Sequence, residues 1–480
     1  MSSGIIHFNL FEMNCVGHIQ HGLWTHPANN RHRYTDLEYW TDLARLLERG
    51  LFDAVFLADV VGTYDRYRGG PETAIREAVQ IPANDPLLVV PAMAAVTEHL
   101  GFAVTFSTTY EPPFAHARRM STLDHLTKGR VAWNIVTSYL RSAARNFGLE
   151  DEIEHDLRYE IAEEYLEVLY KLWEGSWEDS AVVRDRERHV YTDPAKVHAI
   201  DHVGKHFRVA GPHLSEPSPQ RTPVLYQAGN SDRGKEFAAR HAEAVFTGAA
   251  SLEALREDIA DTRRRAAAYG RDPAHITFFP SASVIVARTQ QEVDAKIADL
   301  QRHIRPEGFL AQRGSGIDLA AYDPDELIDH IVARGGDFTE RAVRPLIGRG
   351  LRVRDVLDSV GRIGQGGPFF VAGTPERVAD EIERWADETG ATGFNLMQYL
   401  SPGTAEDFIE LVVPELQRRG RYRTSYEDST LRERLLGPGL HRLPGSHPGA
   451  AYRRSTAPDQ AAIRAQPGDV GPRPQPPPGR

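Results

Sequence analysis

The chain has 480 residues, a formal net charge of −11 and one cysteine, Cys15. A single cysteine excludes an intrachain disulfide and any site built from several thiolates, so redox chemistry would need a bound cofactor. The sequence has no apolar run near the roughly 18 to 20 residues that span a bilayer, and no basic block with interleaved aromatics. Membrane and nucleic acid are therefore disfavoured as partners. The N-terminus does not resemble a secretory signal, so we expect a cytoplasmic protein that binds a small molecule.

Strand-like and helix-like segments alternate along the chain, which predicts βα units around a parallel sheet. The expected strands cover residues 5–10, 54–59, 102–107, 131–137, 224–229, 244–249, 276–286 and 394–399. Helical stretches follow the first four strands at 36–48, 87–100, 115–126 and 156–173. Eight such units favour a closed (β/α)8 TIM barrel over an open doubly wound sheet of five or six strands.

Three segments near 60–86, 174–222 and 305–370 are too long to be ordinary connections, so we interpret them as insertions in one barrel domain over 1–436. Long βα loops form the walls of active sites in such barrels, and the three insertions are therefore expected to determine substrate choice. From residue 437 the chain turns to Gly, Pro, Arg and Ser and loses its apolar periodicity. This composition predicts a disordered tail over 437–480.

Polar residues end the fourth expected strand. The stretch from 129 to 148 reads GRVAWNIVTSYLRSAARNFG, and in it Asn134, Thr137 and Ser138 follow an apolar run. The carboxyl ends of barrel strands are where ligand-contacting side chains lie. This stretch therefore predicts a bound cofactor or substrate.

The same stretch resembles the bacterial luciferase-like flavin monooxygenases, in the branch of nitrilotriacetate monooxygenase, dibenzothiophene-sulfone monooxygenase and pristinamycin IIA synthase. The likeness continues through ERGLFDAVFLAD, AAVTEHLGFAVTFSTTYEPPFAHAR, EHDLRYEIAEEYLEV, DPAKVHAIDHVGKHFRVAGP and PVLYQAGNSDRG. Several motifs in the same order are far more specific than any one of them.

The resemblance implies a luciferase-like barrel that uses reduced FMN (FMNH2) and dioxygen to oxygenate a small organic substrate through a C4a-(hydro)peroxyflavin. The oxidation would cleave a C–N or C–S bond or modify a ring. A separate NAD(P)H:flavin reductase would supply the reduced flavin by diffusion, and the enzyme would be a homodimer or homotetramer. A deazaflavin-dependent oxidoreductase of the same fold, or a barrel hydrolase, is the alternative.

By the same resemblance, the flavin site falls on six residues: Asp59, Thr105, Asn134, His155, Tyr159 and Ser231. Asp59 ends the run AVFLAD, where its carboxylate can accept hydrogen bonds from flavin or simply cap a loop. The Thr105 hydroxyl can reach the ring or bond within the barrel. Asn134 offers a donor and an acceptor to the edge of the flavin ring, or serves as a buried structural amide.

The other three of these residues suit the phosphate end of the cofactor. His155 and Tyr159 are four residues apart, so they share one face if a helix has begun by His155. This spacing also occurs by chance on helix surfaces. Ser231 lies between a strand and a helical pattern, where it can cap the helix, and the N–H groups of a helix N-terminus favour phosphate. Both roles can coexist at Ser231.

Histidines invite two further hypotheses. His21 follows the first strand, where its imidazole can assist proton transfer at the flavin or lie in solvent. His198, His202 and His206 recur every four residues, but Gly204 interrupts the run, which predicts two short strands around a turn. We therefore expect no metal site there.

Overall fold

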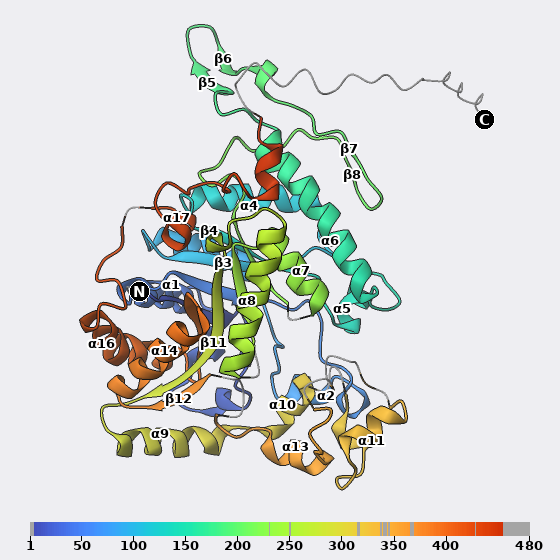
Figure 1. The fold of residues 1–480 in the computed structure, drawn as a ribbon, viewed down its shortest axis with the longest axis vertical. Helices are drawn as coiled ribbons and strands as arrows, with labels where there is room; N and C mark the ends of the chain where they lie inside the picture. The colour runs from blue at the N-terminus through green and yellow to red at the C-terminus, as the bar shows by residue number, and fades with distance from the viewer. Residues whose placement is uncertain are drawn as a thin grey trace, which may run out of the picture.

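A closed barrel of parallel strands forms the centre of the molecule (Figure 1). The computed structural model describes residues 4–229, 231–248, 251–313, 317–336, 338, 343, 346–364, 369–427 and 429–454. The barrel strands are β1 His7–Met13, β2 Ala54–Ala58, β3 Gly101–Ser107, β4 Val131–Val136, β9 Val224–Ala228, β10 Ala244–Thr247, β11 Thr277–Val286 and β13 Gly393–Met397. They follow one another around the ring in this order, and β13 pairs with β1 to close it. The predicted (β/α)8 fold is confirmed.

The strands are apolar on both faces because each lies between the barrel interior and the surrounding helices. Phe56, Ala132 and Tyr226 pack together inside the barrel. On the outer face Trp133 packs against the rings of His116 and Tyr165, which belong to neighbouring helices. Burial on both faces explains the near-continuous apolar runs seen in the sequence.

Helices cover the outside of the barrel and the connections at its ends. They are α1 Leu37–Arg49, α2 Glu72–Arg76, α3 Val90–Ala95, α4 Pro113–Leu126, α5 Arg141–Asn146, α6 His155–Tyr170, α7 Asp232–His241, α8 Leu252–Ala268, α9 Gln290–His303, α10 Pro306–Arg313, α11 Ile328–Ala333, α13 Val353–Ser359, α14 Pro375–Thr389, α15 Gly403–Asp407, α16 Val413–Arg418 and α17 Leu431–Leu436. Among the described helices, none is both long and apolar enough to cross a bilayer.

The eight expected strands do not include β12, Phe370–Gly373. This strand runs parallel to the second half of β11, from Ser283 opposite Phe370 to Val286 opposite Gly373. β11 is ten residues long, so it contributes to the barrel and also extends beyond it to hold β12. A four-residue strand carries too little periodicity to be recognised in sequence.

The three insertions do not lie at the same end of the barrel (Figure 1). The first insertion follows β2 and carries α2, and the third carries α10, α11 and α13; Ala74 and Ala311 pack together where these two insertions meet. The 174–222 insertion instead joins α6 to β9 and forms the hairpins β5–β6 (Val182–Asp185, Val190–Thr192) and β7–β8 (His202–Val203, Arg208–Val209). A helix-to-strand connection lies at the amino ends of the strands. The expectation that this insertion lines the active site is therefore wrong.

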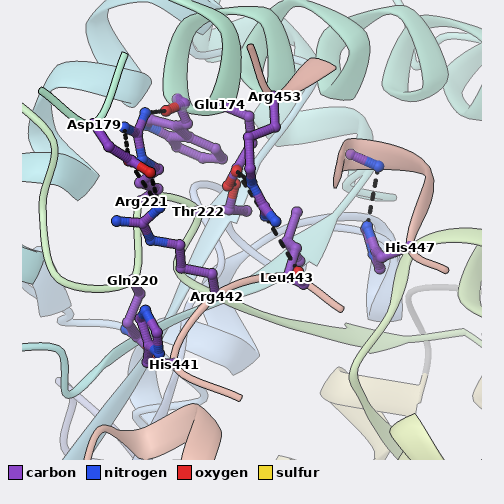
Figure 2. Close-up of polar contacts among 12 residues, drawn as sticks. Glu174, Asp179, Gln220, Arg221, Thr222, His441, Arg442, Leu443, His447 and Arg453 are labelled. Carbon is purple, nitrogen blue, oxygen red and sulfur yellow. Dashed lines mark hydrogen bonds and ion pairs between the residues drawn. The ribbon is translucent and has the colours of Figure 1, made fainter. Parts of the chain in front are cut away.

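The C-terminal part of the chain closes the amino end of the barrel. Leu431 and Leu435 of α17 pack on the inward-facing residues Phe56 and Ala132. The following segment is held by ion pairs of Arg442 with Asp179 and of Arg453 with Glu174, at 2.8 and 2.9 Å (Figure 2).

The prediction of disorder from residue 437 is therefore wrong for 437–454. In this segment Leu443 and His447 are buried, the imidazole Nε2 of His447 donates to the backbone oxygen of His241, and Pro448–Tyr452 form a 3₁₀ turn. The Gly- and Pro-rich composition is typical of a solvated tail, but long-range ion pairs and these few apolar contacts order the segment. Residues 455–480 lie outside the described part.

The buried pair of Arg432 and Glu243 provides a test of this closure. Two guanidinium nitrogens of Arg432 lie 2.7 and 3.0 Å from the Glu243 carboxylate, and another donates to the His441 backbone oxygen at 3.0 Å. Arg432→Ala leaves a buried carboxylate without its partner, so we expect a loss of about 3–5 kcal/mol in the free energy of unfolding, measured by urea denaturation. The control Arg418→Ala removes an exposed pair with Glu415 and should leave the midpoint almost unchanged. Equally small losses of unfolding free energy in Arg432→Ala and Arg418→Ala would contradict a stabilising role for the buried pair.

Candidate active site

Four adjacent strands bring the predicted cofactor-binding residues to one end of the barrel. Asp59 directly follows β2, Thr105 lies in β3, Asn134 lies in β4, and Ser231 follows β9. Because β2, β3, β4 and β9 are neighbours in the ring, their carboxyl ends form one continuous rim. The residues are brought together as the sequence suggested, and their roles in binding remain predictions.

Thr105 and Asn134 form a polar pair inside the barrel. They are opposite each other in the β3–β4 register, and the Asn134 Nδ2 donates to Thr105 Oγ1 at 2.9 Å. Both side chains are buried, and Asn134 Oδ1 has no hydrogen-bond partner among the described residues. A buried acceptor without a partner costs about 1–3 kcal/mol. Asn134 Oδ1 is therefore suited to receive a hydrogen bond from a ligand.

Asp59 is a half-buried carboxyl group at the same rim. Burial and the negative charge of Asp85 raise its pKa, a hydrogen bond from the backbone of Val60 opposes both effects, and the net pKa is about 7. Near neutral pH the carboxyl group therefore exists in both protonation states. It can donate a hydrogen bond in one state and accept in the other.

Gly229 and Gly234, which have no β-carbons, form a cradle at the N-terminus of α7. Ser231 caps this helix, its Oγ accepting from the Gly234 N–H at 3.0 Å. A β-carbon built on Gly234 would lie 2.8 Å from Tyr159 Oη, and one built on Gly229 would lie 3.0 Å from the same oxygen and 2.4 Å from Gln227 Nε2. The Tyr159 hydroxyl therefore lies directly over the capped helix end. Exposed N–H groups at such an end bind anions.

His155 begins α6, as the four-residue spacing required. Its ring meets that of Tyr159 edge-on at 5.2 Å, so the two share one face of the helix. His155 is exposed and pairs with Asp156 at 2.7 Å. It therefore lies at the rim of the cradle, while Tyr159 forms its wall.

His21 is not in solvent, because the third insertion covers it. The ring is fully buried, packs edge-on against Phe309 of α10, and its Nε2 donates to Gln312 Oε1 at 2.9 Å. Burial lowers the pKa of His21 to about 4. A neutral ring whose one proton is bonded to Gln312 can only accept at Nδ1, so the geometry favours a role in holding α10. The catalytic assignment of His21 stays a prediction.

Three residues that the sequence patterns missed form a hydrogen-bonded chain over the rim. The Tyr64 hydroxyl donates to Gln80 Oε1 at 2.8 Å and lies 2.9 Å from the Tyr139 hydroxyl. Since the Tyr64 proton is directed at Gln80, Tyr139 is the donor in its contact with Tyr64. The chain runs from half-exposed Tyr139 into the buried first insertion. No periodicity marks it, although Tyr139 closely follows the polar end of β4.

Apolar side chains complete the inner wall of the rim. Ala58, Phe246 and Met397 lie at the carboxyl ends of three strands, and Ile19 follows β1. All four are partly buried and pack on the aromatic interior of the barrel. The site therefore combines polar groups on four strands with an apolar wall around them.

Metal-ligand residue types occur together at one place in the described part of the chain. The ligand atoms of His26, Asp299 and His303 lie within 4.8 Å of one another. The Ala28 N–H donates to His26 Nδ1 at 3.1 Å, which puts the ring proton on Nε2, and Nε2 donates it to Asp299. A metal would need the lone pair of that same nitrogen. Hydrogen bonding therefore explains the cluster.

The histidine run of the second insertion forms the expected hairpin, β7–β8. Its three imidazoles face separate carboxylates rather than a common point. The pairs are His198 with Glu178 at 2.9 Å, His202 with Glu164 at 3.1 Å and His206 with Glu160 at 2.8 Å. This geometry holds the hairpin against α6.

Comparison with known proteins decides the family. Residues 18–393 match the family model described as luciferase-like monooxygenase. The chain belongs to this family. It is a flavin-dependent monooxygenase, and the sequence resemblance is confirmed.

Individual relatives agree with this assignment over almost the whole chain. The monooxygenase is 57% identical to the long-chain alkane monooxygenase of Geobacillus thermodenitrificans (strain NG80-2), over 93% of this chain and 98% of that protein. It is 49% identical to the dimethyl-sulfide monooxygenase of Hyphomicrobium sulfonivorans, over 96% of each. Among solved structures, a riboflavin lyase (RcaE) with modified FMN and riboflavin superposes with a TM-score of 0.88 at 39% identity, over 94% of this chain and all of that chain.

The raised pKa of Asp59 predicts a pH-dependent stability. The folded state keeps a proton that the unfolded chain releases between the ordinary value of 3.8 and about 7. The stabilisation by the protonated carboxyl is therefore complete below pH 3.8 and is lost as the pH rises through about 7. Between about pH 5 and about pH 8, we expect the wild type to lose roughly 2–3 kcal/mol relative to Asp59→Asn in urea unfolding.

Exposed Asp42 provides the matched control for this experiment, because its Asp42→Asn variant should show the same pH dependence as the wild type. Parallel pH profiles for wild type and Asp59→Asn would contradict the raised pKa.

Proposed function

We propose that this monooxygenase uses FMNH2 and dioxygen to oxygenate a small apolar substrate. The observation that carries the proposal is the combination, at one rim, of a glycine cradle at a helix N-terminus, polar groups on four adjacent strands and an apolar wall. The first two features suit the two ends of a flavin mononucleotide. The third would face a substrate without charge beside the ring.

The residues present fit the cofactor. Ser231 and the N–H groups of α7 would hold the phosphate, with the Tyr159 hydroxyl donating from above. Asn134, Thr105 and Asp59 would meet the polar edge of the ring, where the unpaired Asn134 Oδ1 can accept from a ring N–H. Bound reduced flavin supplies the electrons that activate dioxygen, which protein side chains alone do not provide.

The insertions would keep water out of the site. α10 covers the rim above His21, and the chain of Tyr139, Tyr64 and Gln80 joins the end of β4 to the first insertion. Excluding water protects a reactive oxygen species from release as hydrogen peroxide. In this proposal the neutral His21 positions α10.

An apolar substrate, a hydrocarbon or a thioether, matches the wall of Ala58, Phe246, Met397 and Ile19. The two relatives named above carry the names of apolar substrates, a long-chain alkane and dimethyl sulfide. A separate NAD(P)H:flavin reductase would supply FMNH2 by diffusion, because the barrel and its insertions account for the part of the chain that the structure describes. A homodimer or homotetramer in the cytoplasm remains our expectation.

The activity can be tested directly by reconstitution. We expect purified protein, supplied with a flavin reductase, NADH, FMN and isotopically labelled dioxygen, to place one labelled oxygen atom in an alkane or dialkyl sulfide. A dicarboxylate of similar length should remain unchanged, because the wall offers it no cation. Oxygen consumed only as hydrogen peroxide with every substrate would refute the proposal, and unchanged turnover without dioxygen would point to hydride transfer.

The glycine cradle gives a second test. Gly234→Ala places a β-carbon 2.8 Å from Tyr159 Oη and 3.1 Å from Ser231 Oγ, so the cradle must shift. Overpacking of this kind costs about 1–3 kcal/mol, and we expect roughly tenfold weaker FMN binding in anaerobic titration. The control Gly403→Ala meets only Leu400 Cβ at 3.7 Å and should bind FMN normally. Equal FMN affinities for the two variants would show that the phosphate is not bound at this helix end.

A further inference from the structure

We propose that Glu12 is a positioning residue for the oxygenation, because its carboxylate holds the apolar wall of the site from behind. The inference rests on the proposed function and adds to it a residue outside the site itself. Glu12 is the penultimate residue of β1, at the carboxyl end of the barrel. It is fully buried, so its charge needs partners inside the protein.

Strand geometry directs the Glu12 side chain away from the site. Side chains alternate between the two faces of a strand. Phe11 faces the barrel interior, where its ring lies 5.0 Å from that of Phe246 in the apolar wall, whereas Leu10 belongs to the outer core under the helices. Glu12 shares the face of Leu10 and lies behind the wall. It would therefore act on the substrate only through other residues.

The carboxylate of this residue joins two elements that carry wall residues. Arg31 Nη2 lies 3.0 and 3.2 Å from its two oxygens, and Gln398 Nε2 donates to Oε2 at 2.5 Å. Arg31 belongs to the loop after β1 (residues 14–36), which also contains Ile19. Gln398 directly follows Met397, the last residue of β13. One buried carboxylate thus connects the loop that carries Ile19 to the strand end that carries Met397.

Hydrogen bonds around Ser401 extend this connection. Gln398 Nε2 also donates to Ser401 Oγ at 3.1 Å, and the Tyr39 hydroxyl of α1 lies 2.6 Å from the same oxygen. The Asn30 N–H, beside Arg31 in the loop, donates to the backbone oxygen of Ser401 at 2.8 Å. The loop, α1 and the end of β13 are therefore held as one unit around the carboxylate.

The buried ion pair tethers the loop more strongly than its contacts at the surface. The side chains of Arg31 and Glu12 are 3% and 1% exposed, so salt and water screen their charges little. The pair of His26 with Asp299 also holds the loop, but its carboxylate is 43% exposed, and such pairs contribute little. Removing one partner of a buried pair leaves an uncompensated charge. Relief of that charge, by movement of the loop or entry of water, would displace the wall.

The test compares two buried arginines at opposite ends of the barrel. Arg31→Met and Arg432→Met each remove the cation from a buried Arg–Glu pair, so both should lower the urea midpoint. For Arg31→Met alone, we expect KM for a dialkyl sulfide to rise about tenfold with kcat within about twofold, the equivalent of one to two buried methylene groups. FMN affinity in anaerobic titration should stay within about twofold of the wild type in both variants.

A double variant separates positioning from stability. Arg31→Met combined with Glu12→Gln leaves no uncompensated charge, so its urea midpoint should recover towards that of the wild type. Its KM should stay raised, because no ion pair joins the loop to β1. A KM that recovers together with the midpoint would reduce the pair to a contribution to stability and overturn the assignment.

Hydrogen exchange of the cofactor-free protein provides a readout independent of turnover. Amide exchange should rise at 14–36 and 398–401 in Arg31→Met, and at 437–443 in Arg432→Met. Unchanged exchange at 14–36, or an equal rise of KM in Arg432→Met, overturns the positioning role and leaves the proposed function intact. A wild type that releases all consumed oxygen as hydrogen peroxide with every substrate overturns both.

Discussion

The parallel closure of the barrel is the constraint on which the rest of the structure depends. Every strand of the ring runs in the same direction, so every strand-to-helix connection opens at one end and every helix-to-strand connection at the other. Asp59 and Ser231 are far apart in sequence but lie on the same rim because β2, β3, β4 and β9 are consecutive in the ring. The same geometry sends the hairpins of the 174–222 insertion away from the site.

Much of the fold and the candidate site could be predicted from local sequence. The strand ends of β3 and β4 carry Thr105 and Asn134, and the helix starting at His155 brings in Tyr159, because strand and helix periodicity fix these positions. Sequence could not show that α10 buries His21, since burial depends on a segment nearly 300 residues away. Nor could composition reveal that Arg442 pairs with the exposed Asp179, and Arg453 with the buried Glu174, and that these pairs order a Gly- and Pro-rich segment.

The electrostatics differ between the two ends of the proposed flavin site. At the ring end, burial raises the pKa of Asp59 to about 7, so this end carries little fixed charge. At the proposed phosphate end, the N-terminus of α7 carries a partial positive charge, and Arg233 pairs with Glu163 at 3.6 Å. A cofactor with a neutral, apolar ring and an anionic tail is therefore oriented in one direction only. In the proposed site this polarity would place the reactive part of the flavin beside the apolar wall.

The segment 437–454 stabilises the end of the barrel opposite to the proposed active site. It fastens the barrel at its amino end through Arg442, His447 and Arg453, whereas substrate and oxygen would enter at the carboxyl end (Figures 1 and 2). Loops at the open end can thus change in length and composition without loosening this fastening. A carrier protein or solid support joined beyond Arg454 would attach at the closed end and leave the entrance clear, which makes this end the suitable point for immobilising the enzyme.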